Sequence, residues 1–240
     1  MDSSPEVWRL ERRGILRDSV GVGIATGAYA ISFGALSLTA GLSVLQAMVL
    51  SLFMFTGGSQ FGLIGVLAGG GSPWAGAATA VMLGSRNALY GLRLAPILDL
   101  RGWRRMLAAQ LVIDESSAMS MGRSGDRGAR AGFYGTGLAV FVLWNLGTLI
   151  GAVGAAALSD PRVLGMDAAA PAAFLALLAP RIRSRESWAL ALAAALVALL
   201  ATPFVPPGIP ILIAAAVGVA FGLRRPPAAG SGSRPARVAR

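Results

Sequence analysis

The sequence predicts an all-α fold, a polytopic integral membrane helix bundle with about six to eight membrane segments. Of its 240 residues, 55% are hydrophobic and 13% are charged, whereas roughly a quarter of the residues of a soluble domain are charged. The apolar residues are grouped into runs, and a membrane-spanning helix needs about 20 of them. The remaining length is too short for a sizeable domain outside the membrane.

The composition excludes most enzyme chemistry. The chain has no cysteine and no histidine, so it lacks thiolate nucleophiles, imidazole bases and the usual zinc ligands. It also has no lysine, and therefore no phosphate-binding loop of the G-x-x-x-x-G-K-[ST] type. The net charge of +10 is carried by arginines in short clusters between apolar runs, as in cytoplasmic loops, and not on one nucleic-acid-binding face. We expect a protein that is not an enzyme, needs no cofactor or metal and binds no nucleic acid.

A series of apolar stretches accounts for the expected membrane helices. They cover residues 19–40, 44–68, 74–96, 106–121, 131–158, 168–179, 187–204 and 209–223. The first is longer than the roughly 7 to 15 apolar residues of a signal peptide, so we expect a retained span behind a cytoplasmic N-terminal segment, residues 1–18. The third follows a loop rich in Gly and Pro, the fifth is uninterrupted, and prolines separate the last two. We expect one membrane domain, residues 19–223, and a disordered basic tail, residues 224–240.

Arginine clusters determine the expected topology. They occur in the N-terminal segment, at 101–105, at 123–130, at 181–185 and in the tail, and the positive-inside rule assigns all of them to the cytoplasm. Single crossings in succession would leave some clusters outside. The conflict disappears if stretches 44–68 and 106–121 are broken or re-entrant, which is tolerated where the backbone lines a cavity inside the protein. Both termini are then cytoplasmic.

The second stretch is interrupted by Gly57, Gly58, Ser59 and Gln60. Glycine inside a helix costs about 1 kcal/mol relative to alanine, so we expect a break near these residues that frees backbone groups for a polar ligand. Transporters use such half-helix ends, because the positive amino end attracts a carboxylate. The alternative is an unbroken helix whose glycines let a neighbouring helix pack closely.

Two adjacent acids, Asp114 and Glu115, interrupt the fourth stretch, and a second break is expected near them. An ionised carboxylate at the centre of a span costs about 2.5 to 3.5 kcal/mol on insertion scales, so these residues need a function or a partner. Because burial favours the protonated form of a carboxyl group, either acid could carry a coupled proton. The alternatives are a structural ion pair with Arg86 or Arg93, or a position near the membrane surface. Neighbouring helix positions lie about 100° apart, so one acid could face a cavity while the other pairs.

The third stretch contains a polar group of its own. Arg86 and Tyr90 are four residues apart and share one helix face, and Asn87 is next to Arg86. An arginine, an amide and a phenol inside a span suggest contacts with substrate or with other helices, whereas we expect Arg93 to extend to the membrane surface.

Other features of the spans carry weaker signals. Asn145 in the fifth stretch is a candidate for a hydrogen bond between helices, of about 0.6 kcal/mol. The G-x-x-x-G pairs, such as Gly23 with Gly27 and Gly147 with Gly151, hardly exceed the number that chance supplies in a glycine-rich chain. We therefore draw no helix contact from them.

Several short motifs, taken in their serial order, resemble the AzlC family, which is named for azaleucine resistance. These motifs are Ser32-Phe33-Gly34, Ala40-Gly41-Leu42-Ser43 with Gln46-Ala47, Gly57-Gly58-Ser59-Gln60-Phe61, Ser85-Arg86-Asn87-Ala88-Leu89-Tyr90-Gly91, Asp114-Glu115 and Trp144-Asn145-Leu146-Gly147. The similarity covers about residues 14–223, nearly the whole membrane part.

The resemblance implies the large subunit of a two-component exporter in the bacterial cytoplasmic membrane. The implied substrates are leucine, isoleucine, valine and also methionine or analogues. The implied partner is a small hydrophobic subunit of the AzlD type, and the implied energy source is the proton motive force. One position departs from many relatives, which have a histidine where this chain has Asn87. Coupling through that imidazole is impossible here, which shifts the role to Asp114 and Glu115 or casts doubt on proton coupling.

The expected site combines these features. The substrate-binding candidates are Gly57, Gly58, Ser59, Gln60, Phe61, Arg86, Asn87 and Tyr90; the proton-coupling candidates are Asp114 and Glu115; and the candidate pocket walls are Phe53, Met54, Phe55 and Phe61. The backbone amides or Arg86 would take a substrate carboxylate, and an acid would take the ammonium group or a proton. Two other functions stay open, namely an uncoupled channel or facilitator for a small polar solute and a scaffold subunit that transports nothing.

Overall fold

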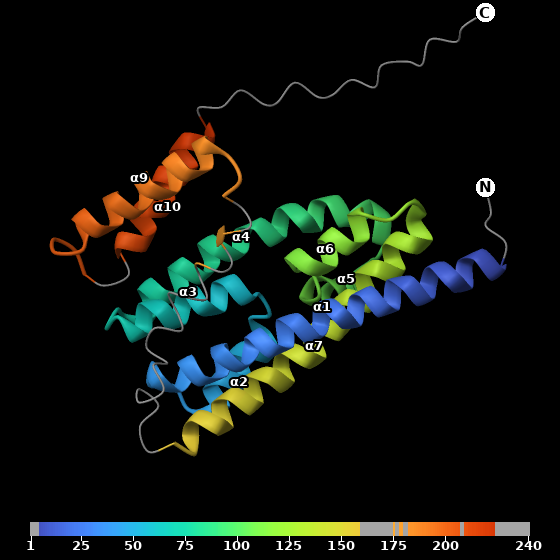
Figure 1. Ribbon diagram of the computed structural model, residues 1–240, viewed down its shortest axis with the longest axis horizontal. Helices are drawn as coiled ribbons and strands as arrows, with labels where there is room; N and C mark the ends of the chain where they lie inside the picture. Colours follow the sequence, from blue (N-terminus) through green and yellow to red (C-terminus); the bar gives the residue numbers. More distant parts are fainter. Residues whose placement is uncertain (1–4, 159–174, 176–177, 180–181, 207–208, 224–240) are drawn as a thin grey trace, which may run out of the picture. The chain divides into compact units, whose positions relative to one another are not determined.

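The computed structural model describes residues 5–158, 175, 178–179, 182–206 and 209–223, and all regular elements within these residues are helices (Figure 1). The all-α prediction is confirmed for this part of the chain. The helices are α1 Pro5–Thr39, α2 Val44–Phe53, α3 Gly57–Ala68, α4 Pro73–Leu98, α5 Gly102–Gln110, α6 Asp114–Met121, α7 Gly125–Ala156, α9 Arg185–Ala201 and α10 Ile209–Leu223. Most of the predicted stretch 168–179 and the predicted tail lie outside the described residues. The chain forms two compact units, Met1–Pro180 and Arg181–Arg240.

The two longest helices, α1 and α7, pack side by side and run in the same direction (Figure 1). Ser19 Oγ near the start of the apolar part of α1 lies 2.9 Å from Thr136 Oγ1 of α7. Further along both helices, Gly34 contacts the backbone of Thr148. Residue numbers therefore rise together along the pair, and we name its two ends the Pro5 end and the Thr39 end, after the limits of α1.

Glycines form the contact between α1 and α7. A Cβ atom on Gly147 would collide with the carbonyl oxygen of Gly27, and one on Gly151 would collide with the carbonyl oxygen of Ile31. A Cβ atom on Gly23 would lie 2.9 Å from Leu143. The G-x-x-x-G pairs, whose number in the sequence hardly exceeds chance, therefore do form a helix contact here, because small residues let two helix backbones approach closely.

The second predicted stretch is a pair of half-length helices, α2 and α3, which meet near the middle of α7. Ser43 and Gln46 form a capping box that starts α2. Along α2, Ser51 donates a hydrogen bond to Thr148 at 3.1 Å, and after its end Phe55 packs against Phe141 with ring centroids 5.0 Å apart. Because the α7 residues are met in descending order, α2 runs from the Thr39 end toward the middle.

Helix α3 turns back toward the Thr39 end and forms a hairpin with α4. Gly57 lies against Trp144, while Phe61 packs against Phe33 at a centroid distance of 5.6 Å. Gly70 takes a positive φ of 77° in the tight turn after α3, and α4 crosses back to the Pro5 end, where Arg130 Nε donates to the Ile97 carbonyl at 2.7 Å.

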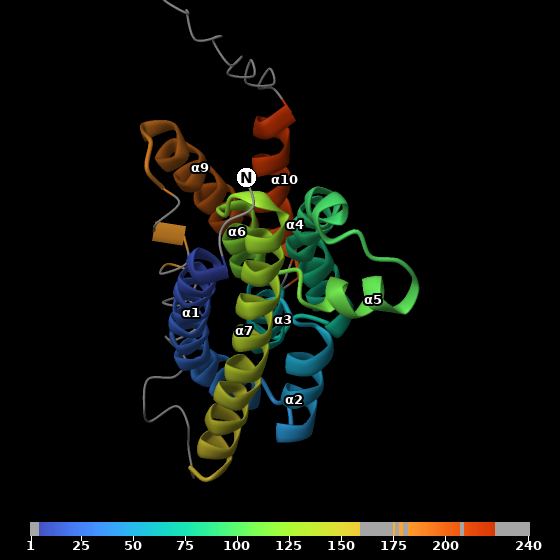
Figure 2. The same cartoon turned by 90° about the vertical axis from the view of Figure 1, so that its right-hand side faces the viewer.

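The fourth predicted stretch is a second pair of half-length helices, α5 and α6, entering from the opposite end. Gln110 at the end of α5 donates through Nε2 to the Leu52 carbonyl at 2.7 Å, so α5 ends in the middle of the unit. Helix α6 then returns alongside α7, with Gly132 against Met119. Figure 2 shows α2 and α6 beside opposite ends of α7. A long helix followed by a half-length pair thus occurs twice, with opposite directions.

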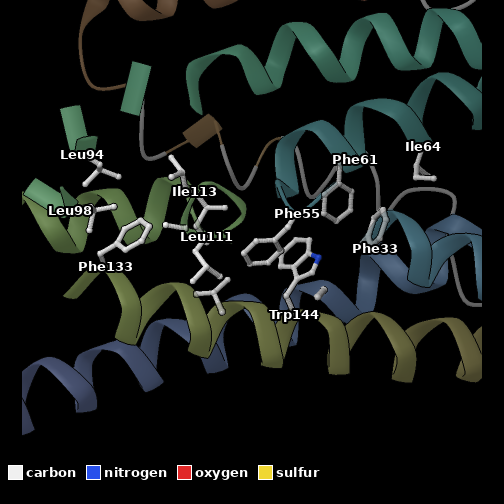
Figure 3. Packing of buried hydrophobic residues seen from close by; sticks show 14 of the residues in the cluster. Phe33, Phe55, Phe61, Ile64, Leu94, Leu98, Leu111, Ile113, Phe133 and Trp144 are labelled. Carbon is white, nitrogen blue, oxygen red and sulfur yellow. The ribbon is translucent and has the colours of Figure 1, made fainter. Parts of the chain in front are cut away.

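The core of this unit follows α7 along its length. Figure 3 shows Leu94, Leu98 and Phe133 at one end of it, Phe55 and Trp144 near the middle, and Phe33, Phe61 and Ile64 at the other. The aromatic rings near the middle and the Thr39 end pack densely around Phe61, which is fully buried. Centroid distances of 4.8 Å to Tyr29 and 6.4 Å to Trp144 lie in the range of favourable aromatic pairs.

Among the described residues, α1 and α7 are long and apolar enough to cross a bilayer. Helices α2, α3 and α10 are apolar but shorter. At 1.5 Å per residue, α2, α3, α5 and α6 reach about 12 to 18 Å, roughly half the 30 Å hydrocarbon core. Large apolar side chains on α1 and α7 are exposed, among them Ile24, Val142 and Ile150, as expected of a surface that faces lipid.

The second unit contains α9 and α10, which pack against each other. Ser184 caps α9 by accepting a hydrogen bond from the Ser187 backbone amide at 3.0 Å. Both helices agree with predicted apolar stretches within a few residues.

Candidate functional site

Both helix breaks lie slightly upstream of the residues that predicted them. Met54, Phe55 and Thr56 separate α2 from α3, so residues 57–60 form the first turn of α3. In the same way, residues 111–113 separate α5 from α6, and Asp114 and Glu115 are the first two residues of α6. Each break therefore presents the amino end of a half-length helix in the middle of the unit.

Arg86 of α4 connects the two amino ends. Its Nη1 lies 3.0 Å from Oδ2 of Asp114, and a Cβ atom added to Gly58 would lie 3.0 Å from its Nη2. Of the two arginines proposed as partners, Arg86 forms the ion pair, while Arg93 lines a separate cavity of about 320 Å³ with Ser120. The arginine side chain is 35% exposed and the aspartate 23% exposed, so the pair is largely but not completely buried.

The amino end of α3 carries no neutralising group of its own. Thr56 occupies the N-cap position in an extended conformation, with no hydrogen bond from its side chain to the helix. The first amides of a helix have no partner within that helix, so the amides of Gly57, Gly58 and Ser59 have none there. The helix dipole makes this end positive, and no acid lies in its first turn.

The amino end of α6 is different because Asp114 and Glu115 lie in its first turn. Carboxylates at this position neutralise the helix dipole. Ser116 secures the break, since its Oγ donates to the Leu111 carbonyl at 2.6 Å and accepts from the Ile113 amide at 3.2 Å. The two amino ends therefore differ in charge, with α3 open to an anion and α6 supplied with its own.

A cavity of about 680 Å³ reaches the first break. Its lining combines the residues of that break, the second half of α4 and parts of α5, and it includes Phe53, Met54, Phe55, Thr56, Asn87, Gly91, Leu94, Leu98, Asp99, Arg101, Arg105, Gln110 and Val112. Such a volume falls within the range of about 300 to 1,000 Å³ that is usual for small-molecule sites. Most of these residues are apolar, and the polar ones lie near the breaks and near the Pro5 end of α4.

Several buried polar atoms around the breaks have no hydrogen-bond partner among the described residues. They include Ser59 Oγ, Gln60 Oε1, Arg86 Nε, Asn87 Oδ1 and Trp144 Nε1. Buried polar groups are normally paired, and an unusual concentration of unpaired ones is a feature of sites that receive a polar ligand or water. No group of three or more His, Cys, Asp or Glu in this part of the chain could hold a metal ion.

The structure brings together some of the predicted site residues and separates others. Arg86, Gly58 and Asp114 converge, and Asn87 lines the cavity, as do the predicted walls Phe53, Met54 and Phe55. Phe61 and Tyr90 do not line the cavity; both pack in or against the hydrophobic core.

Two predicted polar residues donate hydrogen bonds to backbone carbonyls, and one of these bonds connects two helices. Gln60 is fully buried and its Nε2 donates to the Leu50 carbonyl at 3.0 Å, so it connects α3 to α2 across the break. Asn145 donates to the Phe141 carbonyl of its own helix at 2.7 Å, in place of the expected hydrogen bond between helices. Glu115 lies next to Asp114 and is partly buried.

Three cavity-lining residues are not among the predicted ones, namely Gln110, Thr56 and Arg105. Gln110 links the end of α5 to the end of α2 through the Leu52 carbonyl, and all three line the cavity. Gln110 could have been found, because it is an uncharged amide inside an apolar stretch and precedes a break. Thr56 and Arg105 give no such signal, since a threonine before a glycine pair and an arginine in a basic loop are common.

Comparisons with known proteins agree with the resemblance found in the sequence. The family described as AzlC protein matches residues 21–158. Inner membrane protein YgaZ of Escherichia coli (strain K12) is 30% identical over 193 residues, which is 77% of this chain and 78% of YgaZ. No solved structure matches the chain significantly. The relative is an inner membrane protein, and α1 and α7 of this chain are long and apolar enough to cross a bilayer. The chain is therefore a membrane protein.

Proposed function

The chain belongs to the AzlC family, and on that premise we propose that it is a secondary transporter. It exports branched-chain amino acids, namely leucine, isoleucine, valine and also methionine or analogues, across the bacterial cytoplasmic membrane. It acts with a small hydrophobic partner subunit of the AzlD type and is driven by the proton motive force. The observation that carries the proposal is the Arg86–Asp114 ion pair between two half-helix amino ends, next to a mostly apolar cavity.

The chemistry of a branched-chain amino acid matches this arrangement. Its carboxylate needs a cation or a positive helix end, its ammonium group needs a carboxylate, and its side chain needs an apolar wall. Arg86 with the amino end of α3 meets the first need, Asp114 the second, and Phe53 and Phe55 the third. Sites of this kind at broken helices are typical of secondary transporters with inverted repeats.

The proposed topology has α1, α4 and α7 crossing the membrane, with α2–α3 and α5–α6 as re-entrant pairs from opposite faces. The arginines in the first half of α1, around the start of α5 and around the start of α7 then share the cytoplasmic face, in agreement with the positive-inside rule. The parallel orientation of α1 and α7 supports this reading, because the chain must return once between them.

Cysteine labelling tests the topology cleanly, since the native chain has no cysteine. We expect a membrane-impermeant maleimide to label Ser72→Cys in intact cells, because the exposed Ser72 precedes α4 at the Thr39 end. Asp126→Cys, exposed in the first turn of α7 at the Pro5 end, should react only in inside-out vesicles. The reverse pattern would overturn the sidedness, and labelling of both from one face would overturn the re-entrant pairs.

Leucine counterflow in proteoliposomes tests the function. The wild-type protein, reconstituted with and without its small partner subunit, should exchange labelled leucine against unlabelled leucine. Efflux should also accelerate when a proton gradient is imposed. We expect Asp114→Asn to lower exchange by at least about tenfold, because the ammonium group loses its carboxylate.

Glu115→Gln tests the second acid, and Asp126→Asn, which removes an exposed acid in the first turn of α7, is the matched control. Undiminished exchange by both Asp114→Asn and Glu115→Gln would remove the two acids from the mechanism. Flux that ignores a collapsed proton gradient and shows no counterflow would identify a channel or facilitator. No flux with or without the partner would identify a scaffold subunit.

A further inference from the structure

Arg86 carries an unused donor edge that faces the amino end of α3. A guanidinium group has five N–H donors in a planar fork. Nη1 is engaged by Asp114, whereas Nε is buried with no partner among the described residues. Nη2 lies beside Gly58, where an added Cβ atom would come within 3.0 Å of it. The edge formed by Nε and Nη2 can therefore donate two parallel hydrogen bonds to a carboxylate.

The first turn of α3, which lies beside this edge, also carries hydrogen-bond donors. The amides of Gly57, Gly58 and Ser59 begin α3 and have no partner within that helix. The hydroxyl of Ser59, only 1% exposed, adds a buried group without a partner in the described part of the chain. An anion bound at the Nε–Nη2 edge of Arg86 would lie beside this turn and could receive hydrogen bonds from both.

The corresponding turn of α6 cannot serve the same purpose. Asp114 and Glu115 already supply negative charge there, so a second carboxylate would be repelled. The same arrangement suits a cation. A carboxylate can accept several hydrogen bonds, so Asp114 can bind Nη1 of Arg86 and also receive a hydrogen bond from an ammonium group. The two helix ends thus suit the two charged groups of a zwitterion: α3 suits the carboxylate and α6 suits the ammonium group.

We propose that the Nε–Nη2 edge of Arg86 and the first turn of α3 form a carboxylate subsite, and that Asp114, still bound to Nη1, holds the substrate ammonium group. This assignment rests on the proposed function, since it specifies where the exported amino acid binds. Arg86 then positions both halves of the substrate, and it remains ion-paired when the site is empty.

Three ligands with the same side chain distinguish binding of the carboxylate from binding of the ammonium group. They are leucine, 4-methylpentanoate, which lacks the ammonium group, and 3-methylbutylamine, which lacks the carboxylate. Binding to the purified full-length protein is measured by calorimetry, and the two analogues are also tested as competitors of labelled leucine. We expect 4-methylpentanoate to bind the wild-type protein and compete with leucine.

Substitutions should affect the ligands in different ways. Arg86→Lys keeps the positive charge but loses the planar fork, and should weaken 4-methylpentanoate and leucine by at least about tenfold. Gly58→Ala places a methyl group against Nη2 and should weaken the same two ligands. Asp114→Asn should weaken leucine and 3-methylbutylamine while leaving 4-methylpentanoate within about twofold of wild type. Gly21→Ala, on α1 with no atom within 4 Å of the new methyl group, is the matched control.

Each result decides between the subsite and the function. If leucine binds and 4-methylpentanoate neither binds nor competes, the carboxylate subsite is wrong and the exporter proposal stands. If 4-methylpentanoate binds through Arg86 and leucine does not, the substrate class is wrong and the subsite stands. Unchanged binding in both Arg86→Lys and Gly58→Ala, with folding verified by thermal unfolding, overturns the subsite. If neither ligand binds the folded wild-type protein, both proposals fail.

Discussion

Gly151→Ala is expected to destabilise the protein by about 3 kcal/mol, which lies in the upper part of the range for overpacked interiors. The added methyl group would collide with the carbonyl oxygen of Ile31 on α1. A backbone atom cannot rotate out of the way as a side chain can, so α1 and α7 must move apart. This separation also breaks the close contact between Gly27 and Gly147. Without a hydrophobic force between helices in lipid, such packing is a main source of their association.

Gly154→Ala is the matched control for this prediction. It lies one turn further along α7, and a Cβ atom there would have no neighbour within 4 Å. Alanine favours a helix by about 1 kcal/mol over glycine, so Gly154→Ala should be neutral or slightly stabilising. Unfolding in mixed micelles with increasing SDS, followed by tryptophan fluorescence, measures both. Equal midpoints for the two variants would contradict the close α1–α7 contact.

Removing the charge of Arg86 is expected to abolish transport while lowering stability only moderately. Arg86→Gln leaves Asp114 without its ion partner at 3.0 Å. Loss of one partner costs about 3 to 5 kcal/mol for a fully buried pair and under 1 kcal/mol for an exposed one. With side chains 35% and 23% exposed, we expect about 1 to 3 kcal/mol. Leucine exchange should fall by at least about a hundredfold, since the carboxylate loses its cation.

The double variant Arg86→Gln with Asp114→Asn separates the two effects. Neutralising both partners removes the uncompensated charge, so stability should recover while exchange stays absent. Arg93→Gln on the same helix is the control, because Arg93 faces another cavity and should be dispensable for exchange. Recovery of exchange together with stability in the double variant would mean that the pair has a structural role only.

The sequence was sufficient to predict the helical class and a helix break near each of the two polar groups, but not which of the candidate residues lie close together. It failed on the exact start of each half-length helix. Thr56 and Ile113 adopt extended N-cap conformations, so glycines and acids that would disrupt the middle of a helix instead occupy its first turn. The amides of a first turn lack partners within the helix in any case, so Gly57 and Gly58 destabilise the helix less there than they would in its middle.

The α1–α7 contact could not be inferred because helix pairing depends on which faces meet, and hydropathy along one chain does not contain that information. Gly147 and Gly151 acquire their meaning only when Gly27 and Ile31 lie opposite them. The role of Gln60 was missed for a similar reason. Its partner is the Leu50 carbonyl, which also accepts from the Met54 amide at the end of α2. This acceptor comes within reach of Gln60 only because α3 folds back on α2 after the break.

The Arg86–Asp114 pair also has an electrical consequence. A charge that moves through the membrane field gains or loses about 2.3 kcal/mol per 100 mV. The pair is neutral as a whole, and so is an amino acid with one ammonium and one carboxylate group. With the proposed substrate, the loaded and the empty protein therefore have the same total charge at this point, and voltage does not favour the movement of one over the other. Any current that accompanies transport must then come from the coupling ion.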